Sequence, residues 1–224
     1  MKRKGFYMKV CLVTEGELEN FNQEKSQNSE IIAFGFEGIK KLSYKKELRG
    51  ETEELVKIGR LSRDTKSIVV CGTETENYGI KRLSVVVADK GKIVGIADQN
   101  AKSENSVYSS GGGYKIINTA IGKIGILVGE DLFCPEAVKS MSLCEADLII
   151  AIYAGISDHK PNIIARAYSL LYGVPICVCA KGFSFATTIK GETHFSSPQT
   201  VSVVDVPTKK VYREIVSRQR GINI

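Results

Sequence analysis

The sequence of 224 residues predicts one α/β domain, spanning residues 1–224, in which two mixed sheets pack face to face with helices outside. Two observations lead to this four-layer αββα sandwich. The first part of the chain alternates short apolar runs with helical patterns, as βαβ units do, whereas the middle and the end carry hairpin patterns. The length also provides for one sizeable hydrophobic core. The order of units by itself indicates α/β or α+β.

The first part of the chain contains three apolar runs with the length of buried strands, at residues 8–13, 31–36 and 67–72. Residues 15–29 are polar and predict a short helix or a loop. Residues 48–61 place Leu55, Ile58 and Leu61 on one face, with acids early and bases late. This charge order suits the helix dipole, so we expect an amphipathic helix there.

The middle and the end of the chain carry hairpin signals. The turn-forming residues 89–92 separate β-rich runs at 83–88 and 93–96. A polar loop at 101–110 and three glycines at 111–113 precede an expected strand at 114–119. Further strands are expected at 146–151 and 174–180 around a helix at 162–172, and a closing hairpin from 200–206 and 210–215.

A strand, a sharp turn and a helix follow one another between residues 122 and 136. An apolar run at 124–128, bounded by glycines, predicts a buried strand. Gly129 then interrupts the run, and Pro135 with Glu136 predicts the start of a helix, because proline and an acid both suit a first helical turn. Turns of this kind are where α/β enzymes commonly present a nucleophile.

Composition and charge are those of an ordinary water-soluble chain, with 43% hydrophobic and 25% charged residues and a net charge of +6. Basic residues are denser at 1–4 and 40–49. We interpret them as a solvated face rather than as a site for an anionic partner, because no aromatic platform or nucleic-acid motif accompanies them. We therefore expect no nucleic-acid partner. No apolar run is long enough to span a bilayer, so we also expect no membrane partner.

Six cysteines are spread along the chain without CxxC or metal-ligand spacing. Most lie inside apolar runs, where a free cysteine behaves as a small hydrophobe. We therefore expect no metal site and no cofactor, and we expect a reducing compartment, the cytoplasm. The cysteines are Cys11, Cys71, Cys134, Cys144, Cys177 and Cys179.

The segment from Gly122 to Glu136 resembles the nucleophile segment of the nitrilase, or carbon–nitrogen hydrolase, superfamily, which reads roughly G-x-x-G-x-x-I-C-[YWE]-D-x-x-x-P-E. Asp131 and Pro135 are in register without a gap, and Gly129 stands where the family has its catalytic cysteine. Weaker similarities follow in the family's order at residues 69–74, 84–95, 111–119, 145–150, 165–167 and 172–176. The resemblance implies the αββα nitrilase-type fold.

The resemblance implies three catalytic positions: a cysteine that attacks the carbonyl carbon, a glutamate that acts as general base, and a lysine that stabilises the oxyanion. The cysteine position is Gly129, the lysine position is Gln99, and Glu37 is in about the right place for the glutamate. Lys102 is an alternative source of the positive charge. The segment around Glu37 is one residue longer than in the family, so the direction of the Glu37 side chain is left open.

Four further residues are candidates for the pocket by the same resemblance: Glu104, Glu130, Asp131 and Cys134. Glu104 matches a second carboxylate of the family and is otherwise a solvated loop acid. Cys134 is the nearest thiol to Gly129 and precedes a predicted helix, whose dipole can depress a thiol pKa. Its other interpretation is simple packing.

Three functions remain open. The first is a family member with a degenerate triad that does not catalyse and binds a small polar or amide-like ligand or a partner. The second is an active amidohydrolase for a small linear amide or nitrile that uses the thiol of Cys134. The third is an α/β scaffold that acts only through protein contacts. Since family members often pair through the helix after the nucleophile, the resemblance also implies a homodimer.

Overall fold

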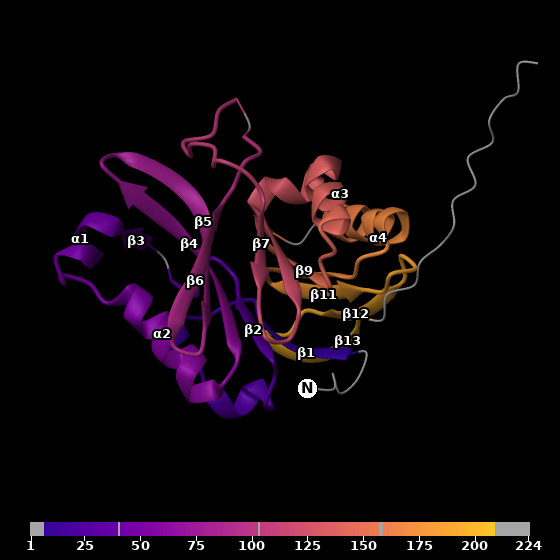
Figure 1. Ribbon diagram of the computed structural model, residues 1–224, viewed down its shortest axis with the longest axis horizontal. Coiled ribbons are helices and arrows are strands. Elements are labelled where there is room, and N and C mark those ends of the chain that lie inside the picture. Colours follow the sequence, from indigo (N-terminus) through magenta and orange to yellow (C-terminus); the bar gives the residue numbers. More distant parts are fainter. Residues whose placement is uncertain (1–6, 40, 103, 157–158, 209–224) are drawn as a thin grey trace, which may run out of the picture.

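The computed structural model describes residues 7–39, 41–102, 104–156 and 159–208, and these residues form two sheets with helices on their outer faces (Figure 1). The strands of the first sheet are β1 (Tyr7–Val13), β2 (Ile31–Phe34), β3 (Lys41–Ser43), β4 (Ile68–Asn77), β5 (Ile80–Asp89), β6 (Lys92–Asp98) and β13 (Val201–Pro207). Those of the second are β7 (Lys115–Asn118), β8 (Lys123–Val128), β9 (Leu148–Ile156), β10 (Ile176–Lys181), β11 (Phe183–Thr187) and β12 (Thr193–Ser197).

Both sheets are mixed. The first has the order β13-β1-β2-β4-β5-β6, with β3 beside β4; β1, β2 and β4 are parallel, and β4, β5 and β6 form antiparallel pairs. The second has the order β12-β11-β10-β9-β8-β7, with β8, β9 and β10 parallel and antiparallel pairs at both ends. The predicted two mixed sheets are therefore confirmed.

Within the described residues, four helices complete the outer layers: α1 (Tyr44–Leu48), α2 (Glu54–Thr65), α3 (Pro135–Leu143) and α4 (Lys160–Tyr172). Helix α2 covers the first sheet, and α3 with α4 covers the second (Figure 1). Three short 3-10 helices are η1 (Leu18–Asn20), η2 (Gln23–Ser26) and η3 (Gly129–Phe133).

The hydrophobic core has one cluster between the sheets and one under each helical layer. Val10, Val70 and Ile150, from both sheets, meet in the central cluster with no exposed surface. The alternate residues of the same strands point to the other face of each sheet, and these residues, such as Ile32 and Ile149, face the helices. Because both faces of each sheet are covered, the central strands are continuously apolar, as their sequences predicted. Each fully buried large apolar side chain contributes roughly 1.5–3 kcal/mol.

The predicted helix at 48–61 is correct in type but not in its bounds. The structure has two helices there, α1 and α2, and Gly50 with φ +69° turns the chain between them. The carboxylate of Glu47 accepts hydrogen bonds from the backbone N–H groups of Glu54 (2.9 Å) and Leu55 (3.1 Å). This side chain thus caps the start of α2 from outside the helix, a contact that hydrophobic periodicity cannot reveal.

Three strands, β3, β11 and β12, were not predicted, and the predicted closing hairpin has a different partner. Residues 200–206 do form a strand, β13, but this strand pairs antiparallel with β1. The other arm, 210–215, and the basic residues 1–4 lie outside the described residues. Among the residues that are described, no helix combines the length and apolar character needed to cross a membrane.

Candidate functional site

The turn after β8 is the feature that positions the site. Val128 is extended (φ −120°, ψ 121°), and Gly129 then takes φ +54°, in the left-handed region. Glycine adopts this conformation without the steric penalty of a β-carbon. Since β8 and β9 are parallel, Gly129 lies at the carboxyl edge of this part of the second sheet. The predicted strand, sharp turn and helix are confirmed, and the turn has the geometry of a nucleophile elbow.

Gln99 comes to the elbow from the first sheet. It directly follows β6, and its backbone N–H donates to the carbonyl of Leu83 on β5 at 2.9 Å. Its side chain is 5% exposed. The side-chain Oε1 accepts from the backbone N–H of Glu130 at 3.2 Å, and Nε2 donates to the carbonyl of Ala101 at 2.7 Å. Both the oxygen and the nitrogen of the Gln99 carboxamide are therefore hydrogen-bonded to backbone groups.

Gln99 and Gly129 are in direct steric contact. A β-carbon built on Gly129 would lie 1.9 Å from Gln99 Oε1 and 3.0 Å from its Cδ. Real β-carbons do not approach other atoms this closely, so the Gln99 carboxamide occupies the space into which a side chain at position 129 would extend. The two positions that the family resemblance assigns to the lysine and the cysteine thus lie side by side.

Asp131 holds the loop after β6 against the elbow. Its side chain is 1% exposed and accepts hydrogen bonds from the backbone N–H groups of Asn100 (2.9 Å) and Ala101 (2.6 Å) and from Asn100 Nδ2 (3.3 Å). Burial raises the pKa of the Asp131 carboxyl, and these hydrogen bonds oppose the rise. Asp131 therefore ties the loop to the elbow and fixes the backbone on both sides of the Gln99 carboxamide.

Glu37 is engaged elsewhere. Its carboxylate accepts a hydrogen bond from Lys181 Nζ at 2.6 Å, and both side chains are partly exposed to solvent. This hydrogen bond raises the pKa of the Lys181 ammonium group. Lys181 ends β10, which is two strands away from β8, roughly 10 Å across the sheet. The structure thus pairs Glu37 with a lysine that the sequence interpretation did not consider.

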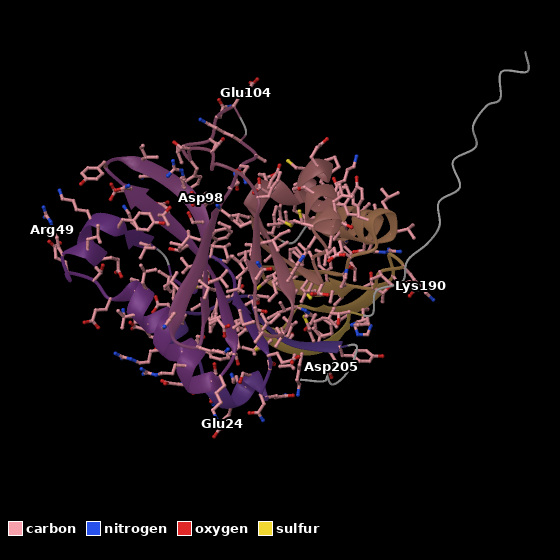
Figure 2. The ribbon with its side chains drawn as sticks, viewed as in Figure 1. Glu24, Arg49, Asp98, Glu104, Lys190 and Asp205 are labelled. Carbon is pink, nitrogen blue, oxygen red and sulfur yellow. The ribbon has the colours of Figure 1, made fainter. Side chains whose placement is uncertain are left out.

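The two other predicted acids point to solvent. Glu104 is exposed and lies at the outer tip of the loop between β6 and β7 (Figure 2). Glu130 is exposed as well, and only its backbone N–H enters the site, through Gln99. Lys102, the alternative source of positive charge, is also exposed. The structure does not bring these three side chains to the Gly129–Gln99 contact.

Cys134 is the residue that precedes α3, and its sulfur is half-buried. It packs beside the apolar cluster under α3 and α4. Burial, and next the negative charge of Asp131, raise the pKa of the thiol; a hydrogen bond with the hydroxyl of Tyr114 lowers it by less. The pKa of this thiol is therefore raised, where the sequence interpretation expected it to be lowered.

Three surface cavities formed by described residues lie in other parts of the fold. Cavities of about 540, 440 and 340 Å³ have no lining residue in common with the predicted site. The 540 Å³ cavity is lined by Glu30 and Ile121, which precede β2 and β8, so it opens at the opposite strand ends from Gly129. Within the described ranges no three His, Cys, Asp or Glu side chains lie close enough to hold a metal ion.

Comparison with known proteins decides the family. A family model described as carbon-nitrogen hydrolase matches residues 10–212, which is most of the chain. The chain belongs to the carbon–nitrogen hydrolase family. No curated protein matches it by sequence.

Solved structures of carbon–nitrogen hydrolases share the fold. A carbon-nitrogen hydrolase from Helicobacter pylori G27 has 16% identity and a TM-score of 0.73, over 89% of this chain and 89% of that chain. A mutant amidase from Nesterenkonia AN1 of the nitrilase superfamily has 16% identity and a TM-score of 0.74, over 91% and 92%. A double mutant of the Nesterenkonia amidase in complex with acrylamide has 16% identity and a TM-score of 0.73, over 92% and 93%.

The contact of Gly129 with Gln99 brings together a small set of chemical groups. Residue 129 supplies no nucleophilic atom, and residue 99 supplies a neutral amide. The polar groups that meet there are the backbone N–H of Glu130 and the backbone carbonyl of Ala101. Sequence reasoning missed the Ala101 carbonyl, because any residue type carries one. It also missed Lys181, although this lysine follows directly on a strand that was predicted.

Proposed function

We propose that this member of the carbon–nitrogen hydrolase family does not hydrolyse amides and works by binding. The observation that supports this most is the contact of Gly129 with Gln99: the nucleophile position carries only hydrogen, and a neighbouring carboxamide fills the space beside it. Covalent catalysis of acyl transfer needs an activated nucleophile. Removing one from a hydrolase lowers kcat by a factor on the order of 10⁶.

An active amidohydrolase that uses Cys134 is the second candidate function. Its support is the position of this thiol just before α3, five residues after the elbow. Two facts argue against it. The pKa of the thiol is raised, whereas a nucleophilic thiol needs a lowered one. No base is hydrogen-bonded to the thiol among its described partners; its partner is the hydroxyl of Tyr114.

The proposed ligand of the site is a small amide-like molecule. The backbone N–H of Glu130 and the carbonyl of Ala101 are a donor and an acceptor at the spacing of one carboxamide. A neighbouring structure, the Nesterenkonia amidase double mutant, is described as a complex with acrylamide. That protein has the same fold, so a small amide is the natural first ligand to test in this one.

The proposed partner is a second copy of the chain. Large apolar side chains are exposed on the helices that follow the elbow: Leu143 on α3, and Ile163 and Leu171 on α4, are each more than 60% exposed. Apolar side chains grouped on one helical layer favour a protein interface. If the site binds nothing, this surface supports the third possibility, a scaffold that acts through protein contacts alone.

The free cysteines suit a reducing compartment, so we also propose the cytoplasm.

The first test is an assay of ammonia release from acetamide, propionamide and acrylamide, with the wild-type protein at high concentration. We expect no turnover above the uncatalysed rate. Turnover that disappears in a Cys134→Ser variant, and survives in a Cys144→Ser control, would replace our proposal with the active amidohydrolase. Cys144 is exposed and lies at the other end of α3, so it controls for the loss of one thiol.

The second test restores the family's residues. A Gly129→Cys, Gln99→Lys double variant removes the carboxamide that blocks position 129 and supplies a thiol and an ammonium group. We expect it to become acylated by an amide or an activated ester, which mass spectrometry detects as a mass increase. Gly129→Cys alone is the control, because Gln99 still fills the space there. Failure of the double variant to acylate would favour the scaffold function.

A further inference from the structure

The Gln99 carboxamide makes one hydrogen bond through its oxygen and one through its nitrogen, the two kinds that a primary amide can form. Oε1 lies against the backbone N–H of Glu130, the residue after the elbow position. In hydrolases with a nucleophile elbow, that N–H is the one that holds the substrate carbonyl oxygen. Nε2 of the same carboxamide donates to the carbonyl of Ala101. The oxygen also lies at the place where the side chain of residue 129 would begin.

We propose that the carboxamide of Gln99 is a built-in ligand of this site, which it keeps closed to free amides. This inference deepens the proposed function and rests on it. A site that cleaved amides would either cleave the Gln99 carboxamide or keep it out. The ligand class is primary carboxamides, which combine a carbonyl acceptor with N–H donors. The device that controls their access is one side chain of the protein itself.

The covalent tether gives the internal amide a large advantage. A tethered group competes at an effective concentration in the millimolar range or above. It also loses little freedom on binding, since the backbone of Gln99 is fixed by hydrogen bonds to Leu83 and Gly111. A free amide must therefore displace a preorganised competitor, and we expect the wild-type protein to bind small amides much more weakly than a variant without the Gln99 carboxamide does.

Truncating the side chain removes the competitor and leaves its two partners unsatisfied. Gln99→Ala deletes a group with the same heavy atoms as acetamide, and the part-buried N–H of Glu130 and carbonyl of Ala101 then lose these hydrogen bonds. Such unpaired groups are costly, so a molecule that pairs with both stabilises the variant. We expect acetamide at about 0.1 M to raise the Tm of Gln99→Ala by roughly 3–5 °C and to leave the wild-type Tm unchanged.

Two matched controls separate specific binding from solvent effects. N,N-dimethylacetamide keeps the carbonyl but has no N–H to offer Ala101, so it should not raise the Tm of Gln99→Ala. A Gln99→Leu variant refills the space without polar atoms, and acetamide should not stabilise it. Equal Tm shifts for acetamide in Gln99→Ala, Gln99→Leu and the wild type, or no shift in any of them, would overturn the proposal.

A measurement on the wild-type protein applies even if Gln99→Ala does not fold. With ¹⁵N-glutamine labelling, the Gln99 side-chain signal is the one that disappears in Gln99→Leu. We expect its two NH₂ protons to exchange slowly with water and to keep their shifts in excess acetamide. Exchange at the rate of a free amide would contradict the inference. Ammonia release by the wild type would instead refute the proposed function, so the two failures are distinguishable.

Discussion

At the scale of single residues, the site depends on a steric match between Gly129 and Gln99. Any side chain at position 129 meets two penalties: φ +54° is unfavourable for residues with a β-carbon, and Gln99 Oε1 already fills the space. The sequence could single out both residues, because the resemblance to the family assigns each of them to a catalytic position. It could not reveal that Oε1 turns toward the elbow, since that depends on the Glu130 N–H.

The first prediction concerns Gly129→Ala, which we expect to lower the free energy of unfolding by about 2–4 kcal/mol. In the Gly129→Ala, Gln99→Ala double variant, the carboxamide is gone and part of this loss should be recovered. Urea unfolding of the single and double variants gives the coupling free energy. Gly112→Ala is the control, because a β-carbon there meets no atom within 4 Å. Strict additivity of the two substitutions would contradict the steric match.

Asp131 illustrates what burial does to an acid of the motif. The sequence assigned Asp131 to the pocket, and the structure gives it a backbone-holding role, with hydrogen bonds from Asn100 and Ala101. Burial nevertheless raises its pKa above the ordinary value of 3.8. A group with a raised pKa in the folded state binds its proton more tightly there than in the unfolded chain. Its contribution to stability is therefore largest at low pH and declines as the pH rises through this window.

The second prediction follows from this sign. From pH 3.8 upward, the stability of the wild type should fall relative to Asp131→Asn until the folded-state pKa is passed, and the difference should then be constant. Urea midpoints of both proteins across the acidic range measure it. Glu104→Gln, which removes an exposed acid, is the control for the loss of one carboxylate. If the stability of the wild type instead rose relative to that of the Asp131→Asn variant as the pH increased, the hydrogen bonds would outweigh burial.

At the scale of elements, the β4–β5–β6 meander carries Gln99 to the elbow, and a buried chain of polar side chains fixes its register. Thr75 and Ser84 are hydrogen-bonded through their hydroxyls at 2.8 Å, and Ser84 Oγ donates to Asp98 Oδ1 at 2.6 Å. Asp98 is the last residue of β6 and the neighbour of Gln99. This chain therefore links three strands next to the site.

The third prediction tests that link. Ser84→Ala leaves Thr75 and Asp98 without their shared partner, so we expect a loss of about 1–3 kcal/mol in the free energy of unfolding. We also expect faster hydrogen exchange at the N–H of Gln99, which bonds to β5. Ser110→Ala is the matched control, because Ser110 is exposed. Unchanged exchange at Gln99 together with lower stability would mean that the hydroxyl chain stabilises the sheet without holding the site.

Elements were predicted well where a local pattern determines them. The strands β1, β2, β8 and β10 and the helix α3 are continuous apolar runs or begin with a proline, so local sequence suffices. Strand β11 reads Phe-Ser-Phe-Ala-Thr directly after β10, separated by Gly182 with φ +77°, and it forms a strand because it pairs with β10 and β12. Glu37 is the equivalent case in the site, because its ion pair with Lys181 joins residues 144 positions apart.

At the scale of the whole molecule, the site lies at strand ends and the proposed dimer surface lies on the outer helical layer. The site lies where β6 of the first sheet and β8 of the second present their ends. Helices α3 and α4 cover the outer face of the second sheet, at the opposite end of the molecule from α1 (Figure 1). Each layer buries one face of its helices, and the other face of α4 keeps Ile163, Leu170 and Leu171 exposed. A second copy packed on this layer would bury that apolar face.

The fourth prediction is that the wild-type protein is a dimer and that Ile163→Glu with Leu171→Glu makes it monomeric. Both side chains are more than 60% exposed in the single chain, so the substitutions should not disturb the fold. Two carboxylates buried at an interface without partners cost several kcal/mol each, enough to dissociate an ordinary dimer. Sedimentation equilibrium measures the mass, and circular dichroism checks the fold. Leu48→Glu, on α1 and 89% exposed, is the control and should remain dimeric. A monomeric wild type would remove the proposed homodimer, and a variant that stays dimeric would move the interface to another face.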